Sequence, residues 1–253
     1  MILRRVITHV RKQEWTAIGI DLVIVVVGVF IGIQVANWNE ARRDRADEGA
    51  VLKSLHEEVS AAKTLSARIL ADRLDVLDRL AESADRLYGA GTVELGAGHC
   101  IAIASSNDLY VGFADLPSFS QLLSSGRVAI IRDHALLDAL SGLTQARAAL
   151  EFALKSFDTA LVNLSQTHAQ AIRLVPREIP VATSPSDRER DYGAECDIDA
   201  LAGDPEFRNA LITNLEYFDA FARDGLRPWV HKLEEVHNRL DAILAIRHDG
   251  AMP

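Results

Sequence analysis

An uninterrupted apolar stretch near the N-terminus is long enough to cross a membrane as a helix. Residues 16–36 contain a single ionisable side chain, Asp21, and would span about 31 Å as a helix. Trp15 and Trp38 stand at its two ends, where aromatic side chains anchor a span at the membrane interfaces. We therefore expect a transmembrane helix over residues 15–38. A buried soluble helix rarely combines this length with two aromatic ends, and a cleaved signal peptide has a shorter apolar core.

Beyond this segment, apolar residues recur every three or four positions in three long stretches. This spacing predicts helices over about 41–88, 133–174 and 204–248. Residues 50–88 contain neither Pro nor Gly, so we expect the first helix to continue directly from the membrane segment. The pattern indicates an all-α fold: a single N-terminal transmembrane helix that continues into a long helix, followed by an antiparallel helical bundle outside the cytoplasm.

Capping and breaking residues mark the ends of these helices. Asp133 and Asp204 are expected N-caps of the second and third helices. Gly225 and Pro228 predict a kink or break in the third helix near Arg227.

The connecting segments are expected to be mostly irregular. Pro117 is expected to begin a short helix over 118–124, and 128–131 to form a brief extended run. Residues 89–117 are interpreted as a loop with short helical parts or a small hairpin, and residues 175–203 as a loop or linker.

Charge is distributed unevenly along the chain. The 27 Lys and Arg residues against 36 Asp and Glu residues give a net charge of −9, which argues against a nucleic-acid partner. Residues 1–14 carry a cluster of basic side chains and apolar residues at helical spacing, and predict a basic amphipathic cytoplasmic tail, with a frayed tail as the alternative. The basic residues in question are Arg4, Arg5, Arg11 and Lys12.

The flanking charges decide the expected topology only in part. Lys and Arg are equally numerous on the two sides of the apolar segment. The short basic tail resists translocation, whereas a long acidic domain is translocated with little regard to its charge. We therefore place the N-terminus in the cytoplasm and residues 39–253 outside it.

One face of the predicted membrane helix combines an acid with small residues. Ala17, Asp21, Gly28 and Gly32 fall within about 60° of one another on a helical wheel. A small-xxx-small pair lets two helices approach closely, so this face predicts self-association or docking on a partner. For Asp21 itself, three interpretations stay open: an interfacial side chain that reaches the cytoplasmic surface or Lys12, a structural helix contact, or a proton-responsive or ion-coupled group.

Polar residues close the far end of the same helix. Gln34 and Asn37 lie near the expected outer interface, next to Trp38. They are expected either to form interhelical hydrogen bonds or simply to be solvated at the interface.

Cys100 and Cys196 are the two cysteines of the chain. In an oxidising compartment such a pair favours a disulfide, which would stabilise the fold by about 4–5 kcal/mol in the chain-entropy model. Two free thiols are the alternative if the domain were cytoplasmic.

The sequence contains no strong catalytic or metal-binding motif. Its eight histidines are scattered. Glu234 and His237 match half of a ferritin-like Glu-x-x-His pattern, and we expect them to lie on a solvated helix face. No phosphate-binding loop, dinucleotide loop or nucleophile elbow is present. We expect no cofactor, no metal and no enzymatic activity.

Two stretches resemble an uncharacterised family of bacterial single-pass membrane proteins. The first opens with Gly19-Ile-Asp21 and closes with Gln34-Val-Ala-Asn37-Trp-Asn-Glu40, where that family has an acidic residue and Gln-x-x-Asn-Trp-Asn-Glu. The second comprises 118–123 and 125–131. The resemblance covers the membrane helix and roughly residues 40–145, and the family often has Glu at the place of Asp21. It implies an inner-membrane location and a helical domain in the periplasm, and no activity.

These observations lead to three functional hypotheses. The first is a membrane-anchored, oligomeric periplasmic scaffold or sensor/adaptor without catalytic activity. It is expected to be held in the lipid bilayer and to self-associate through its transmembrane helix and the 50–88 helix. The second is an ion-coupled accessory subunit that uses Asp21 beside another inner-membrane protein. An enzyme of lipid or envelope metabolism is the third. Because only about 14 residues precede the span, a signal is expected to leave through a partner protein.

Overall fold

The computed structural model describes residues 15–109, 111, 113, 115–176 and 192–246, with side chains from Gly19 onward. The predicted tail, residues 1–14, lies outside this range, as do the side chains of Trp15 and Ala17. The described chain is mostly helical, with one small sheet, and the all-α prediction is confirmed to that extent. In chain order the elements are α2 (Trp15–Leu87), α3 (Ala97–Ala104), α4 (Pro117–Ser124), the 3₁₀ turn η1 (Val128–Ile130), α5 (His134–Asp158), α6 (Leu164–Thr167), β1 (Ile172–Pro176), β2 (Tyr192–Cys196), α7 (Ile198–Gly203), α8 (Pro205–Asp219), the π-helical segment η2 (Ala220–Leu226) and α9 (Arg227–Leu244).

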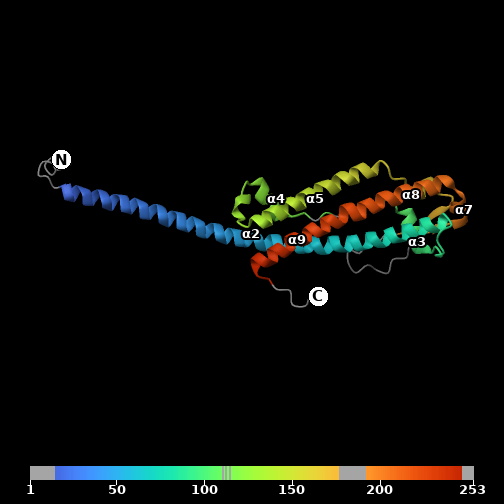
Figure 1. Cartoon of the computed structure of the whole chain (residues 1–253), viewed down its shortest axis with the longest axis horizontal. Coiled ribbons are helices and arrows are strands. Elements are labelled where there is room, and N and C mark those ends of the chain that lie inside the picture. Colours follow the sequence, from blue (N-terminus) through green and yellow to red (C-terminus); the bar gives the residue numbers. More distant parts are fainter. Residues whose placement is uncertain (1–14, 110, 112, 114, 177–191, 247–253) are drawn as a thin grey trace.

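A single helix, α2, runs from the apolar segment into the bundle (Figure 1). Its 73 residues correspond to about 110 Å of helix. Gly49 lies within α2 without interrupting it. The expected continuity between the apolar segment and the helix at 41–88 is therefore present.

The inner half of α2 packs against the other long helices. α9 runs antiparallel to both α2 and α5 (Figure 1). The apolar stripe of α2 is 0–5% exposed along its length. Its buried members are Leu52, Leu55, Val59, Ala62, Leu77, Leu80, Ala84 and Leu87. These eight side chains pack against the chain's own helices. Self-association through the 50–88 helix therefore stays a prediction that would have to use other side chains of this helix.

Two hydrophobic cores lie along α2. The proximal core, nearer the apolar segment, joins the Leu52–Ala62 part of α2 to α5 and to α9 around Trp229. The distal core joins the Leu77–Leu87 part to α3, α8 and the sheet around Phe207. The bundle thus has two hydrophobic cores, one toward each end of the part of α2 that it encloses.

The third predicted helix is divided into α8 and α9. Asp204 caps α8, accepting from the backbone N–H of Phe207 at 3.2 Å, as predicted. The interruption expected near Arg227 is the π-helical segment η2. Gly225 within it allows close packing with α5, because a Cβ there would lie 2.7 Å from the Leu150 Cδ1.

The helix predicted over 133–174 is wrong in its second half. Asp133 does cap α5, accepting from Leu136 N at 2.7 Å, but α5 ends at Asp158. Asn163 then caps the short helix α6. Of the apolar residues that prolonged the helical pattern, Leu164 begins α6 and Ile172 begins strand β1.

The interpretation of 175–203 as a loop or linker is also wrong at the two described ends of this range. Strands β1 and β2 pair antiparallel, with Ile172 opposite Cys196 and Pro176 opposite Tyr192, and α7 follows. The charged run within 177–191 lies outside the described residues. At 128–131 the expected extended run is the 3₁₀ turn η1, whereas the predicted helices at 118–124 and within 89–117 are present as α4 and α3.

Candidate functional site

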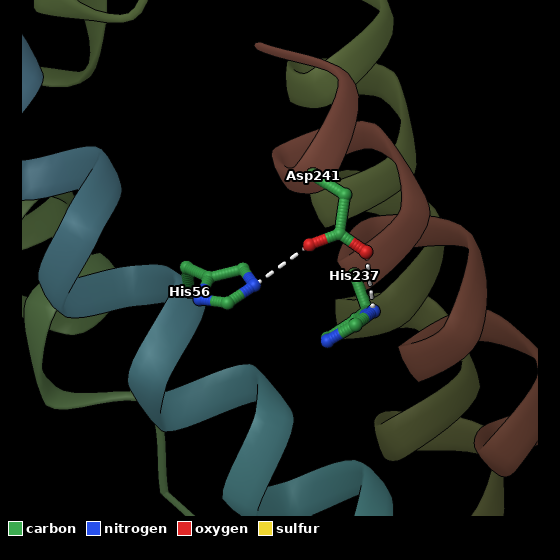
Figure 2. A group of neighbouring side chains, drawn as sticks. All are labelled: His56, His237 and Asp241. Carbon is green, nitrogen blue, oxygen red and sulfur yellow. Dashed lines mark hydrogen bonds and ion pairs between the residues drawn. The ribbon is translucent and has the colours of Figure 1, made fainter. Parts of the chain in front are cut away.

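A cluster of ionisable side chains joins α2 to α9 within the proximal half of the bundle. His56 comes from α2, and His237 and Asp241 lie one turn apart on α9 (Figure 2). Each residue contributes one ligand-type nitrogen or oxygen, and these atoms lie within 4.8 Å of one another. We call these three residues the His–Asp cluster.

The local sequence explains why polar groups meet here. On α9, His237 follows Val236 at the edge of the buried stripe, so its imidazole is 4% exposed. On α2, His56 follows Leu55 in the same way and is 16% exposed. When the two apolar stripes pack face to face, their polar edges meet as well.

Asp241 connects the two imidazoles. Its Oδ1 accepts a hydrogen bond from His56 Nε2 at 2.8 Å, and its Oδ2 lies 3.1 Å from His237 Nδ1. The rings of His56 and His237 are 5.0 Å apart between centroids. A single, 14%-exposed carboxylate therefore holds both histidines, one from each helix.

Lys63, two turns further along α2, completes the surroundings. Its Nζ lies 3.2 Å from His237 Nδ1. The Nδ1 atom cannot donate to Asp241 and accept from Lys63 at the same time, because it carries either a proton or a lone pair. Three ligand-type atoms and an ammonium group thus meet at one place between α2 and α9, an arrangement suited to accepting a cation.

The sequence analysis missed this cluster. It expected Glu234 and His237 on a solvated helix face. Glu234 is exposed, but this expectation is wrong for His237, which is buried and belongs to the cluster. The usable signals were the four-residue spacing of His237 and Asp241, and the seven-residue spacing of His56 and Lys63 along one edge of a stripe. Neither signal says that the two edges meet.

The predicted membrane face is exposed in the structure. Asp21 is exposed, and a Cβ added at Gly28 or Gly32 would meet no atom within 4 Å among the described residues. Large apolar side chains from Ile20 to Trp38 are 47–64% exposed. The chain itself thus brings no described segment against this face.

The interfacial residues are solvent-facing as well. Gln34, Asn37 and Trp38 are exposed. The guanidinium of Arg42 lies 6.0 Å from the Trp38 ring, one turn further along α2. Such a cation–π pair suits the boundary between an apolar and a polar medium.

The structure brings together Cys100 of α3 and Cys196 of β2. They form a disulfide with Cα atoms 5.7 Å apart and 96 positions apart in sequence. The bond fastens the sheet to the helix that packs on the far end of α2.

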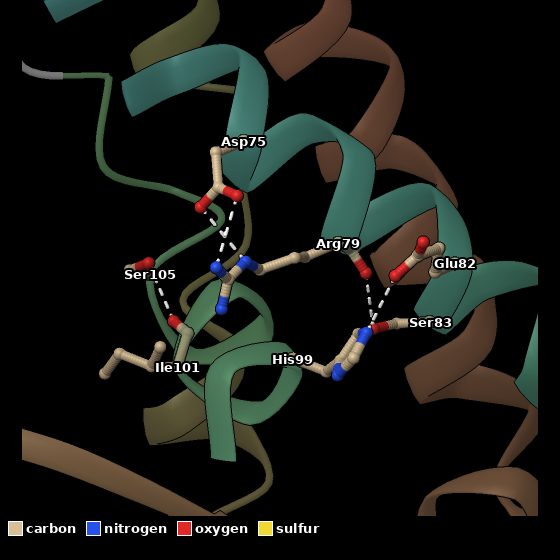
Figure 3. A network of polar contacts seen from close by, with 7 residues as sticks. All are labelled: Asp75, Arg79, Glu82, Ser83, His99, Ile101 and Ser105. Atoms are coloured by element: carbon tan, nitrogen blue, oxygen red, sulfur yellow. Dashed lines mark hydrogen bonds and ion pairs between the residues drawn. The ribbon is translucent and has the colours of Figure 1, made fainter. Parts of the chain in front are cut away.

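A second polar network lies at this far end (Figure 3). His99 Nδ1 accepts from the backbone N–H of Gly96 at 3.1 Å, which fixes the proton of the neutral imidazole on Nε2. That Nε2 donates to Glu82 at 2.8 Å. The Nδ1 contact thus caps the start of α3, and the Nε2 contact anchors α3 to α2, so the network is structural.

Comparison with curated proteins and with solved structures finds no match to this chain. A family model does match, over residues 21–171, which include most of the apolar segment, the rest of α2, and the elements from α3 to α6. His56 and Lys63 lie within the matched region, and α9 with His237 and Asp241 lies beyond it. The matched model is that of a family of unknown function, DUF6090, and because it covers more than half of the chain, the protein belongs to this family.

Proposed function

We propose that this protein is a single-pass protein of the bacterial inner membrane that acts as a scaffold or sensor/adaptor, without catalytic activity of its own. The observation that carries the proposal is the continuity of α2. The outer part of α2 is strongly apolar, with a mean hydropathy of 2.4 over 18 residues, none of which is buried. The inner part of α2 is the central helix of the bundle. A change in the packing of the bundle would therefore tilt or rotate the membrane segment directly.

Two observations support a periplasmic position for the bundle. The Cys100–Cys196 disulfide is of a kind that persists in oxidising compartments. A cleaved signal sequence would also be apolar and N-terminal, but here the apolar segment and the bundle share one unbroken helix. Protease protection in spheroplasts tests this topology: the bundle should be digested from outside, and its protection would contradict the proposal.

Self-association is proposed to run through the membrane face of Asp21, Gly28 and Gly32. The buried stripe of α2 packs within the bundle, whereas no described segment of the chain lies against Gly28 or Gly32, so this face is open to a second copy. Glycines four residues apart allow the close helix contact that packing in lipid requires.

The mass of the full-length protein in nanodiscs tests self-association. Wild type should form a discrete homo-oligomer, and Gly28→Leu should dissociate it. Gly19→Leu is the matched control, because Gly19 lies about 180° from Gly28 on the helix. A monomeric wild type, or equal loss with both variants, would refute the assembly surface.

The ion-coupled accessory subunit is the second candidate, favoured by one observation. Asp21 is an exposed carboxyl in an otherwise apolar surface, and such residues usually face a partner or a water-filled path. This candidate requires that a polytopic partner co-purifies with wild type and is lost with Asp21→Asn. Homo-oligomers unaffected by Asp21→Asn would favour the scaffold.

A further inference from the structure

We propose that His56, His237 and Asp241 bind a divalent transition-metal ion of the zinc type. This goes beyond the proposed function and does not depend on self-association or on membrane topology. A set of two imidazoles and one carboxylate favours such ions. Mg²⁺ and Ca²⁺ instead prefer sites made of oxygen ligands alone.

The geometry is close to that of a coordinated ion. In a tetrahedral zinc site with metal–ligand bonds of about 2.0–2.2 Å, ligand atoms lie roughly 3.3–3.5 Å apart. The three ligand atoms of the cluster lie within 4.8 Å of one another, and Asp241 already lies 2.8 Å from His56 and 3.1 Å from His237. A contraction on the order of 1 Å, within the reach of side-chain rotation, would complete the site.

Three protein ligands leave a fourth position for water. His56 also lines a shallow open groove on the surface of α2, together with Ser60 and Thr64. An ion would enter from this side, while His237 at 4% exposure closes the inner side. His56 must present a lone pair at the ligating nitrogen, so binding requires a tautomer shift of this ring or release of its proton.

Lys63 occupies the place of the cation in the present arrangement. Its ammonium lies 3.2 Å from His237 Nδ1, the atom whose lone pair would ligate the metal. Its side chain is half-buried on a flexible stem and can turn toward solvent. Lys63 is therefore an internal competitor, and its removal should strengthen metal binding.

A bound ion would join the C-terminal helix to the helix that enters the apolar segment. His237 and Asp241 lie in the last two turns of α9, and His56 lies on α2. Coordination would replace hydrogen bonds between α2 and α9 by metal bonds, at the end of the bundle nearest the apolar segment (Figure 1). This is where a change in helix packing would be transmitted along α2.

The experiment uses the full-length, tag-free protein in nanodiscs, after a chelator has removed bound metal. Calorimetry follows a titration with Zn²⁺ alone, and visible absorption follows a separate titration with Co²⁺ alone. Wild type should bind one ion per chain, with Co²⁺ giving the intense bands of a four-coordinate site. His56→Ala and Asp241→Asn should each weaken binding at least 10-fold, and Lys63→Met should strengthen it about 10-fold. His231→Ala is the matched control, because His231 lies exposed on the same helix outside the cluster.

Three results would overturn the proposal. The first is no binding by wild type and by Lys63→Met. The second is stoichiometric binding that His56→Ala and Asp241→Asn leave unchanged. The third is equal weakening by His231→Ala. His56 is varied rather than His237, because replacing the buried His237 would disturb the packing of the bundle. Circular dichroism verifies that each variant is folded.

Discussion

The two ends of the bundle treat their polar groups differently. At the distal end a disulfide joins α3 to β2, and His99 has one defined acceptor and one defined donor contact. At the proximal end, Asp241 and Lys63 both contact the same atom, Nδ1 of His237, which cannot serve both contacts at once.

This difference separates a fixed end from an adjustable one. A polar network in which every contact is satisfied stabilises a single arrangement, whereas one in which two groups compete for the same atom can rearrange when an ion binds. The adjustable end lies nearer the apolar segment, on the same helix (Figure 1). We expect the distal end to act as the rigid support of α2 and the proximal end to change.

Removing the disulfide should give the largest effect. For two cysteines 96 positions apart, the chain-entropy model expects a loss of about 4–5 kcal/mol in the Cys100→Ala/Cys196→Ala variant. Denaturant unfolding measures the loss, and hydrogen exchange should locate it first in the Leu77–Leu87 part of α2. Reductant should not affect the double variant; equal stability of oxidised and reduced wild type would contradict this expectation.

Truncating Trp229 should destabilise the proximal core by about 3–5 kcal/mol. The indole is 1% exposed, contacts Phe113 edge-on and donates to Ser66 Oγ at 3.2 Å. In Trp229→Ala, hydrogen-exchange protection should fall in the Leu52–Ala62 part of α2 and stay unchanged in the Leu77–Leu87 part. Ser66→Ala is the smaller control, because it leaves only the indole N–H without its acceptor. Uniform loss of protection along α2 would show that the two ends are not separate.

Asp133 links the proximal ends of α5 and α9 and should contribute about 1 kcal/mol as an N-cap. Hydrogen bonds from the Arg239 guanidinium lower the pKa of the Asp133 carboxyl below its ordinary 3.8, against the opposing effect of burial. A lowered pKa means that the charge-dependent stability is present above pH 3.8 and is lost as the pH falls through the folded-state pKa.

Two variants separate the cap of Asp133 from its charge. Asp133→Ala should lose both, whereas Asp133→Asn keeps a capping oxygen and loses only the acid-dependent part. Unfolding midpoints between pH 2.5 and pH 7 measure the difference. An acid dependence that persists in Asp133→Asn would assign it to other carboxyls.

The Glu82–His99 contact at the distal end should give the smallest effect. Glu82 is 48% exposed, and Glu82→Gln retains an acceptor for His99 Nε2, so the expected loss is under about 0.5 kcal/mol. Thermal unfolding of the variant measures it. A large loss would mean that the distal network depends on this charge rather than on the disulfide and the core.

The sequence was most informative where one signal repeats over many residues. Apolar residues at steps of three and four extend over several turns of α2, and Asp133 and Asp204 cap helices because their side chains bond to backbone N–H groups next to them in sequence. The apolar segment and its continuity with the bundle follow from the same kind of local evidence. The pairing of the two cysteines needed only that there are two of them.

The errors lie where local patterns are short. Ile172 and Leu174 fitted the tail of a helical pattern, yet they form β1, because a strand 20 residues later pairs with them. On α2, the polar Ser66 is buried and the apolar Leu65 is 46% exposed, because Ser66 accepts a hydrogen bond from Trp229 of α9. The stripe of α2 was visible as an interaction surface, but not the fact that its partner is α9 of the same chain.

The sequence by itself thus determined the apolar segment, the long helix and the caps, because each depends on residues within a few turns of one another. Only the tertiary structure decided the His–Asp cluster. His56 and Asp241 are 185 positions apart, and their 2.8 Å contact exists because two antiparallel helices, aligned by the packing of their apolar stripes, bring the polar edges of those stripes together.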